Sequence, residues 1–141
     1  MIYLLDTDHV TLDQHGHSWV TSRLRLAGPS QVTISVITVE EQLRGWLAVI
    51  RGAATAQKRS AAYLELRKAV TYFASFTLLD YTPAVDALVA DLRQQGVRIG
   101  TQDLRIAALA LTHGATVITR NQRDFRQVPG LLIEDWSLPV G

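Results

Sequence analysis

Short apolar runs recur along the chain and alternate with segments in which apolar residues are spaced as on one face of a helix. Runs of a few residues that end at a polar side chain fit strands that are buried on both faces of a parallel sheet. The strands predicted in this way are residues 2–5, 32–36, 76–79 and 116–119, with a candidate last strand at 131–133. The segments between them are predicted to be mainly helical.

Helical spacing predicts helices at residues 19–26, 38–50, 54–74, 83–96 and 101–113, after a polar connection that follows the first strand. Thr82 and Pro83 supply an N-cap and a first-turn proline, and Thr101 is predicted to cap the alanine-rich helix. The helices at 38–50 and 54–74 form a predicted hairpin. This alternation indicates an α/β fold, a single three-layer α/β/α domain over residues 1–141 with a central, mainly parallel sheet of four to five strands.

Composition and charge limit the chemistry that is available. With 141 residues and 48% hydrophobic content, the chain is long enough for one domain with a sizeable core. The formal net charge of +1 gives no global electrostatic argument for a nucleic-acid partner. The absence of cysteine excludes disulfides, zinc–thiolate sites and thiol nucleophiles. The N-terminal MIYLLDTD has no basic region and its apolar run stops at Asp6, so we expect a cytoplasmic protein without a signal peptide or membrane span.

Acidic residues follow several of the predicted strands. In an open parallel sheet, ligands gather beyond the carboxyl ends of the strands. The carboxylates expected there are Asp6, Asp8, Glu40, Glu41, Asp103 and Asp124. Oxygen ligands without cysteine or a histidine cluster select hard cations such as Mg²⁺ or Mn²⁺, and a cation would relieve the repulsion between the carboxylates. The pattern therefore points to metal-assisted phosphodiester hydrolysis.

Each carboxylate also has an ordinary structural explanation. Thr38 and Glu41 fit a capping box, in which the glutamate bonds back to the start of its helix. Asp103 and Asp124 in first helical turns would complement the helix dipole. The structural explanation is weakest for Asp6, because a carboxylate next to a buried strand is costly unless a partner is present. Only the joint arrangement favours a metal site.

Four motifs in this chain resemble those of the VapC-type PIN-domain ribonucleases. They are MIYLLDTD, ISVITVEEQLRG, IGTQDLRIAALAL and VITRNQRDFRQVPGLLIEDW, and they span nearly the whole sequence in the family's order. The resemblance implies an endoribonuclease, dependent on Mg²⁺ or Mn²⁺, that hydrolyses RNA phosphodiester bonds with a metal-activated water. It also implies a small antitoxin partner of the VapB type and a homodimer.

The resemblance assigns roles residue by residue. Asp6 and Asp103 match the first and third acidic ligands. Glu41 is preferred to Glu40 as the second ligand, because the family places its glutamate four residues before a glycine, here Gly45. Asp124 matches the fourth position, and Asp8, Thr119 and Asn121 are expected to support the site.

Basic and apolar residues near these motifs suggest further contacts. The arginines that flank the third and fourth motifs could hold the RNA backbone; they are Arg98, Arg105, Arg120 and Arg123. A groove on the helical hairpin could take an amphipathic helix at Leu43, Trp46, Leu47 and Ile50, although a core position is the better explanation for each of these residues alone. His9, His15 and His17 are expected to be exposed loop residues and receive no role.

Two other functions fit part of the sequence. The signature Asp6-Thr7-Asp8-His9-Val10 fits a phosphatase of the haloacid dehalogenase type, with Asp6 as nucleophile and Asp8 as acid/base. That chemistry also needs a downstream lysine at the site, and both lysines lie in the predicted hairpin. The second alternative is a catalytically silent PIN-like binding module.

Overall fold

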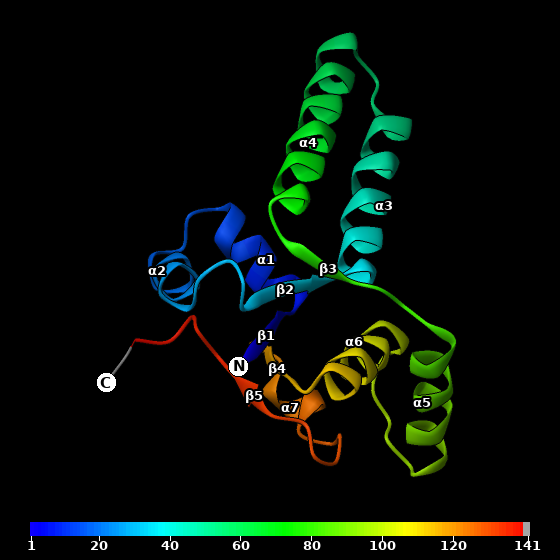
Figure 1. Ribbon diagram of the computed structural model, residues 1–141. Coiled ribbons are helices and arrows are strands. Elements are labelled where there is room, and N and C mark those ends of the chain that lie inside the picture. The colour runs from blue at the N-terminus through cyan, green and yellow to red at the C-terminus, as the bar shows by residue number, and fades with distance from the viewer. Residues whose placement is uncertain (140–141) are drawn as a thin grey trace.

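In the computed structural model, which describes residues 1–139, five parallel strands form one sheet in the order β3-β2-β1-β4-β5 (Figure 1). The strands are β1 (Ile2–Leu5), β2 (Val32–Ser35), β3 (Thr77–Leu79), β4 (Ala115–Ile118) and β5 (Ile133–Glu134). Leu5 of β1 is opposite Ile34 of β2 and Ile118 of β4, so these three strands end together. The predicted parallel sheet is confirmed, and the carboxyl ends of its central strands share one edge.

Seven helices connect and flank the described strands. They are α1 (Thr7–Gln14), α2 (Ser18–Ala27), α3 (Val36–Gly52), α4 (Ala56–Ala74), α5 (Pro83–Gln94), α6 (Thr101–His113) and α7 (Gln122–Phe125). Figure 1 shows α3 and α4 as an extended hairpin that projects from the sheet, as the sequence predicts. Within residues 1–139, no helix has the length and apolar character needed to cross a membrane.

Two apolar clusters cover opposite faces of the sheet. Successive residues of a strand point to opposite faces, and accordingly Leu4 belongs to one cluster with α5 and α6 while Leu5 belongs to the other with α1, α2 and α4. Both leucines are fully buried. The three-layer α/β/α arrangement is therefore confirmed, with β1 buried on both faces.

Three local predictions are wrong. Residues 7–14 form α1, whose weak amphipathic pattern hides it in the sequence; Asp6 caps it by accepting a bond from Thr7 N at 2.8 Å. Helix α3 begins at Val36, two residues earlier than predicted, because Ser35 is the N-cap and accepts from Thr38 N at 3.2 Å. Thr101 is the first residue of α6 and does not cap it; Gly100 holds the N-cap position.

The new start of α3 removes the capping-box explanation for Glu41. A capping glutamate lies three residues after the N-cap, and that position is now held by Thr38. The side chain of Glu41 is therefore available for another role. By contrast, the predicted cap at Thr82 is confirmed, since its hydroxyl accepts from Val85 N and Pro83 begins α5.

Candidate active site

The acidic residues predicted for the site lie where strands end and helices begin. Asp6 directly follows β1 and Asp8 lies in the first turn of α1. Asp103 and Asp124 lie in the first turns of α6 and α7, and Glu41 lies on α3. Helix N-termini provide backbone N–H groups that favour negative charge.

Asp6 is held firmly at the centre of this edge. Only 5% of the residue is exposed, and its two carboxylate oxygens accept hydrogen bonds from Thr7 N and from Thr119 Oγ1, each at 2.8 Å. The pKa of Asp6 is raised to about 7, mainly by burial and also by the neighbouring charges of Asp8 and Asp103, although its two hydrogen bonds act in the opposite direction. The site therefore concentrates negative charge in a poorly solvated place.

Asn121 connects two further carboxylates. Its Nδ2 donates to Asp103 Oδ2 at 3.2 Å and to Asp124 Oδ2 at 3.1 Å. Burial, then the charges of Asp124 and Asp8, raise the pKa of Asp103, while the bond from Asn121 lowers it. Thr119 and Asn121 thus contact four acidic side chains between them, and their supporting role stays a prediction.

Glu41 and Glu40 point to different surroundings. Glu41 Oε1 accepts from Thr7 Oγ1 at 3.1 Å, and burial followed by the nearby charge of Asp103 raises the pKa of Glu41. Glu40 instead forms an ion pair with Arg44 at 2.7 Å and accepts from Gln102 at 3.0 Å. Glu41 therefore faces the other carboxylates and Glu40 lies on the neighbouring surface.

The carboxylates are near enough to repel one another, but they do not converge on a single position that one ion could occupy. Within residues 1–139, no three acidic or histidine side chains lie in the geometry of ligands to one ion. The aspartate Asp103 nevertheless raises the pKa of both Asp6 and Glu41, and its own pKa is raised by Asp124. Asp103 is the electrostatic centre of the group.

His9 is the functional candidate that the sequence prediction missed. It is fully buried on α1, and its Nδ1 lies 2.8 Å from Asp8 Oδ1, so the expected exposed loop position is wrong. Its other nitrogen contacts Trp136 N at 3.1 Å. A lone histidine in a helix with little amphipathic pattern gives no signal in one sequence; only its position next to Asp8 could have drawn attention to it.

The arginines do not form a common cluster. Arg120 donates through Nε to Ser137 Oγ at 3.0 Å, and Arg105 lies over the ring of Tyr81 with its guanidinium carbon 5.8 Å from the ring centroid. Arg98 and Arg123 are exposed. The structure therefore leaves the predicted RNA contacts of Arg98 and Arg120 as predictions.

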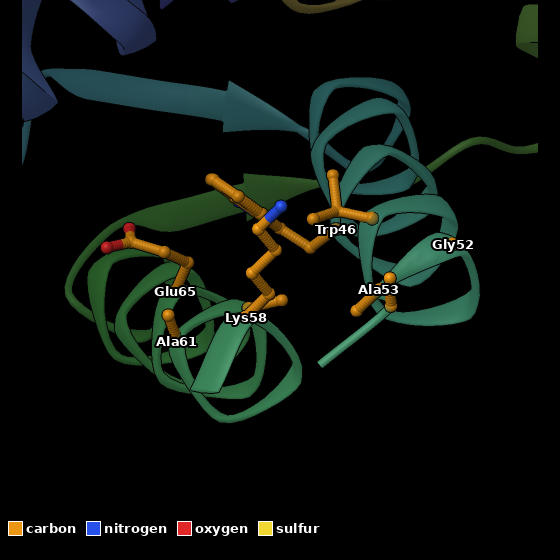
Figure 2. Close-up of a pocket in the computed structure, with 9 residues that line it drawn as sticks. Trp46, Gly52, Ala53, Lys58, Ala61 and Glu65 are labelled. Carbon is orange, nitrogen blue, oxygen red and sulfur yellow. The ribbon is translucent and has the colours of Figure 1, made fainter. Parts of the chain in front are cut away.

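A pocket of about 530 Å³ lies away from the carboxylates, between α3 and α4 (Figure 2). Trp46 and Lys58 lie between the two helices, and Ala53, Ala61 and Glu65 also line the space. The other lysine, Lys68, also belongs to α4 and pairs with Glu65. Both lysines are thus on the hairpin, which removes the nucleophile-supporting lysine that the phosphatase alternative needs.

The fold and the acidic edge together define a PIN domain, and the sequence pattern of that domain matches residues 3–131. Ribonuclease VapC1 of Haemophilus influenzae is 30% identical, with 97% of this chain and 99% of the relative covered. The tRNA(fMet)-specific endonuclease VapC of Salmonella typhimurium is 32% identical over 76% of each chain. The solved structure of VapBC-1 from nontypeable Haemophilus influenzae aligns with a TM-score of 0.75 at 25% identity, covering 98% of this chain and 100% of the other.

These matches are extensive enough to assign the family. The chain belongs to the VapC-type ribonuclease toxins of toxin–antitoxin systems. The resemblance drawn from the four motifs is confirmed, and the phosphatase alternative is contradicted.

Proposed function

We propose that this chain is an endoribonuclease that depends on Mg²⁺ or Mn²⁺ and that Asp6, Glu41, Asp103 and Asp124 hold the metal. The observation that carries the proposal is that hydrogen bonds to shared threonine and asparagine residues gather these four partly buried carboxylates at one edge of the sheet. Such a group is costly in a folded protein, since like charges in a partly buried place raise one another's pKa. A cluster kept at this cost is better explained by function than by stability.

The donor set fits a hard divalent cation. The ligands offered are carboxylate oxygens, with amide and hydroxyl groups of Asn121 and Thr119 beside them, and Mg²⁺ and Mn²⁺ prefer oxygen ligands. When bound, such a metal polarises a phosphodiester oxygen and lowers the pKa of a water molecule. Its charge would also offset the burial and the repulsion that raise the pKa of Asp6, Glu41 and Asp103.

The chain's own residues fix the orientation of the carboxylates before RNA arrives. Thr119 and the Thr7 amide hold both oxygens of Asp6, and Asn121 holds one oxygen each of Asp103 and Asp124. Because these oxygens are already oriented, little reorganisation is required during the reaction. Arg120 and Arg98 are proposed to hold the RNA backbone; Arg120 uses Nε for Ser137, and a guanidinium has further N–H donors for phosphate.

Cleavage of total cellular RNA by the purified chain tests this function. Discrete fragments are expected with Mn²⁺ or Mg²⁺ and intact RNA with EDTA. RNA that stays intact under every condition would contradict the proposal and favour a silent binding module. Isothermal titration with Mn²⁺ in the same preparation separates loss of metal binding from loss of catalysis.

Glu41→Gln and Glu40→Gln form a matched pair for the second motif. Glu41→Gln is expected to lower kcat/KM about 100-fold, because it removes a charge aimed at the other carboxylates. Glu40→Gln should change kcat/KM by less than about threefold, since exposed ion pairs such as that with Arg44 contribute little. The measurement is initial cleavage rate against RNA concentration at saturating Mn²⁺. A larger loss in Glu40→Gln would show that the proposed ligand is wrong.

We further propose that an antitoxin helix binds the α3/α4 hairpin. Leu47 and Val49 are about half exposed, at 47% and 49%, whereas Leu43 and Trp46 are half-buried against the core and Ile50 is half-buried. Trp46 and Val49 line the pocket between the helices, and an apolar groove of this kind suits an amphipathic helix.

Hydrogen exchange of the complex should show protection of the exposed face of α3; protection confined to α5 and α6 would contradict this placement. Self-association is part of the same proposal, and sedimentation of the free toxin tests it.

A further inference from the structure

The imidazole of His9 joins two segments that are far apart in the sequence. It is fully buried, and no part of its side chain is accessible to solvent. Nδ1 lies 2.8 Å from Asp8 Oδ1 on the same helix, and Nε2 lies 3.1 Å from the backbone nitrogen of Trp136 near the other end of the described chain. Both ring nitrogens are therefore in hydrogen bonds.

The partners determine where the imidazole proton lies. The backbone N–H of Trp136 can only donate, so Nε2 must accept and the proton of the neutral ring must lie on Nδ1. Nδ1–H then donates to Asp8. Asp135 Oδ1 is farther from Nε2, at 3.4 Å, and already accepts two hydrogen bonds from Ser137. The backbone N–H of Trp136 is thus the better partner for Nε2.

Asp8, which His9 orients, also contacts the loop after β4 that contains Thr119 and Asn121. Its second oxygen, Oδ2, accepts from Arg120 N at 3.0 Å and lies 3.4 Å from Thr119 Oγ1. The loop after β4 is therefore tied to the start of α1 through Oδ2 of Asp8, while Oδ1 of the same carboxylate is held by His9. That loop contains Thr119, which bonds Asp6, and Asn121, which bonds Asp103 and Asp124.

From these contacts we infer that His9 is a positioning residue for RNA cleavage: it orients Asp8, and Asp8 fixes the loop that orients the catalytic carboxylates. The inference rests on the proposed ribonuclease function. Among the hydrogen bonds and ion pairs of residues 1–139, the imidazole of His9 has none with the side chains of Asp6, Glu41, Asp103 or Asp124. Its role therefore depends on the donor at Nδ1.

Two substitutions separate the two hydrogen bonds of His9. An asparagine amide lies near the place of Nδ1, so His9→Asn can keep the donor to Asp8. A glutamine amide reaches the place of Nε2, so His9→Gln can keep the acceptor for Trp136 but loses the donor to Asp8. The kcat of His9→Gln should fall about tenfold at saturating Mn²⁺, with KM for RNA little changed, and that of His9→Asn by less than about threefold.

A purely structural role predicts a different result. Each variant removes one buried hydrogen bond, so both should unfold at lower temperature by similar amounts and keep the kcat of the wild type. A folded His9→Gln protein with wild-type kcat would overturn the inference. Rescue by asparagine but not by glutamine would support it.

Nitrogen-15 NMR of the imidazole rings provides a readout that needs no cleavage. At neutral pH, His9 is expected to show the tautomer with its proton on Nδ1. His17 is an internal control, because its Nδ1 accepts from Val20 N at 3.3 Å and its proton should lie on Nε2. A proton on Nε2 of His9 would overturn the inference even if both variants misfold. Wild-type protein that cleaves no RNA but shows the expected tautomer would instead count against the proposed function and leave the contact with Asp8 supported.

Discussion

Asp6→Asn is expected to abolish RNA cleavage, with kcat lowered about 1,000-fold or more, which corresponds to about 4 kcal/mol of lost transition-state stabilisation. The substitution removes one negative charge from the centre of the acidic edge and keeps the size of the side chain. Its amide oxygen can still accept from Thr7 N, so the start of α1 is preserved. The measurement is the rate of fragment formation from purified RNA at saturating Mn²⁺.

The control for this variant is its thermal stability without metal. Because burial and repulsion disfavour the charge of Asp6, the asparagine protein should be at least as stable as the wild type at neutral pH. A folded Asp6→Asn protein that cleaves RNA at the wild-type rate would refute the metal-binding role of Asp6. A variant that loses both fold and activity would show that Asp6 is mainly structural.

The stability of the metal-free protein should fall as pH rises toward neutrality. The pKa of Asp6 is about 7 in the folded protein against 3.8 in the reference state. The stability contributed by its protonated form is therefore complete below about pH 3.8 and is lost as pH rises through about 7. The raised pKa values of Glu41 and Asp103 act in the same direction. Thermal melts in EDTA across this range measure the effect.

Mn²⁺ should reverse that loss at neutral pH. At a concentration about 100 times its Kd, a bound ion adds about 2.7 kcal/mol, which for a domain of this size raises Tm by roughly 8 °C. The increase should shrink in acid as the carboxylates take up protons. Asp6→Asn is the matched variant, in which the increase should be much smaller. A wild-type Tm that is unaffected by Mn²⁺ at neutral pH would contradict the metal site.

The sequence predicts the sheet well because its strands are short, apolar and bounded by polar residues. The run at 2–5 is confirmed as β1, and the acidic residues after it lie at the edge where β1, β2 and β4 end. The choice of Glu41 over Glu40 came from the family's spacing to the glycine at Gly45 and stays a prediction; the bond between Glu41 and Thr7 could not be read from that spacing. Strand order and helix packing bring these residues together, and neither can be read from local pattern.

The features that the sequence did not predict depend on contacts between distant segments. Helix α1 has little amphipathic pattern, because its buried face is shared with a polar network around His9. The cap of α3 at Ser35 competes with an equally plausible threonine three residues later, and only the packed structure decides between them. The arginines have similar local surroundings in the sequence but different partners in space, such as Ser137 for Arg120.

The short segment after β5, which contains Trp136, is needed to complete the packing around β1 and His9 and is synthesised after all the strands. Trp136 packs edge-on against Tyr3 with ring centroids 5.0 Å apart, and its backbone holds His9. A ribosome therefore delivers Asp6, Glu41 and Asp103 well before it delivers the residue that closes the network around them. Until Trp136 has left the exit tunnel, the nascent chain contains the proposed ligands but lacks the backbone N–H that holds His9. A toxin built in this way completes the network around its proposed metal site only after all five described strands have been synthesised.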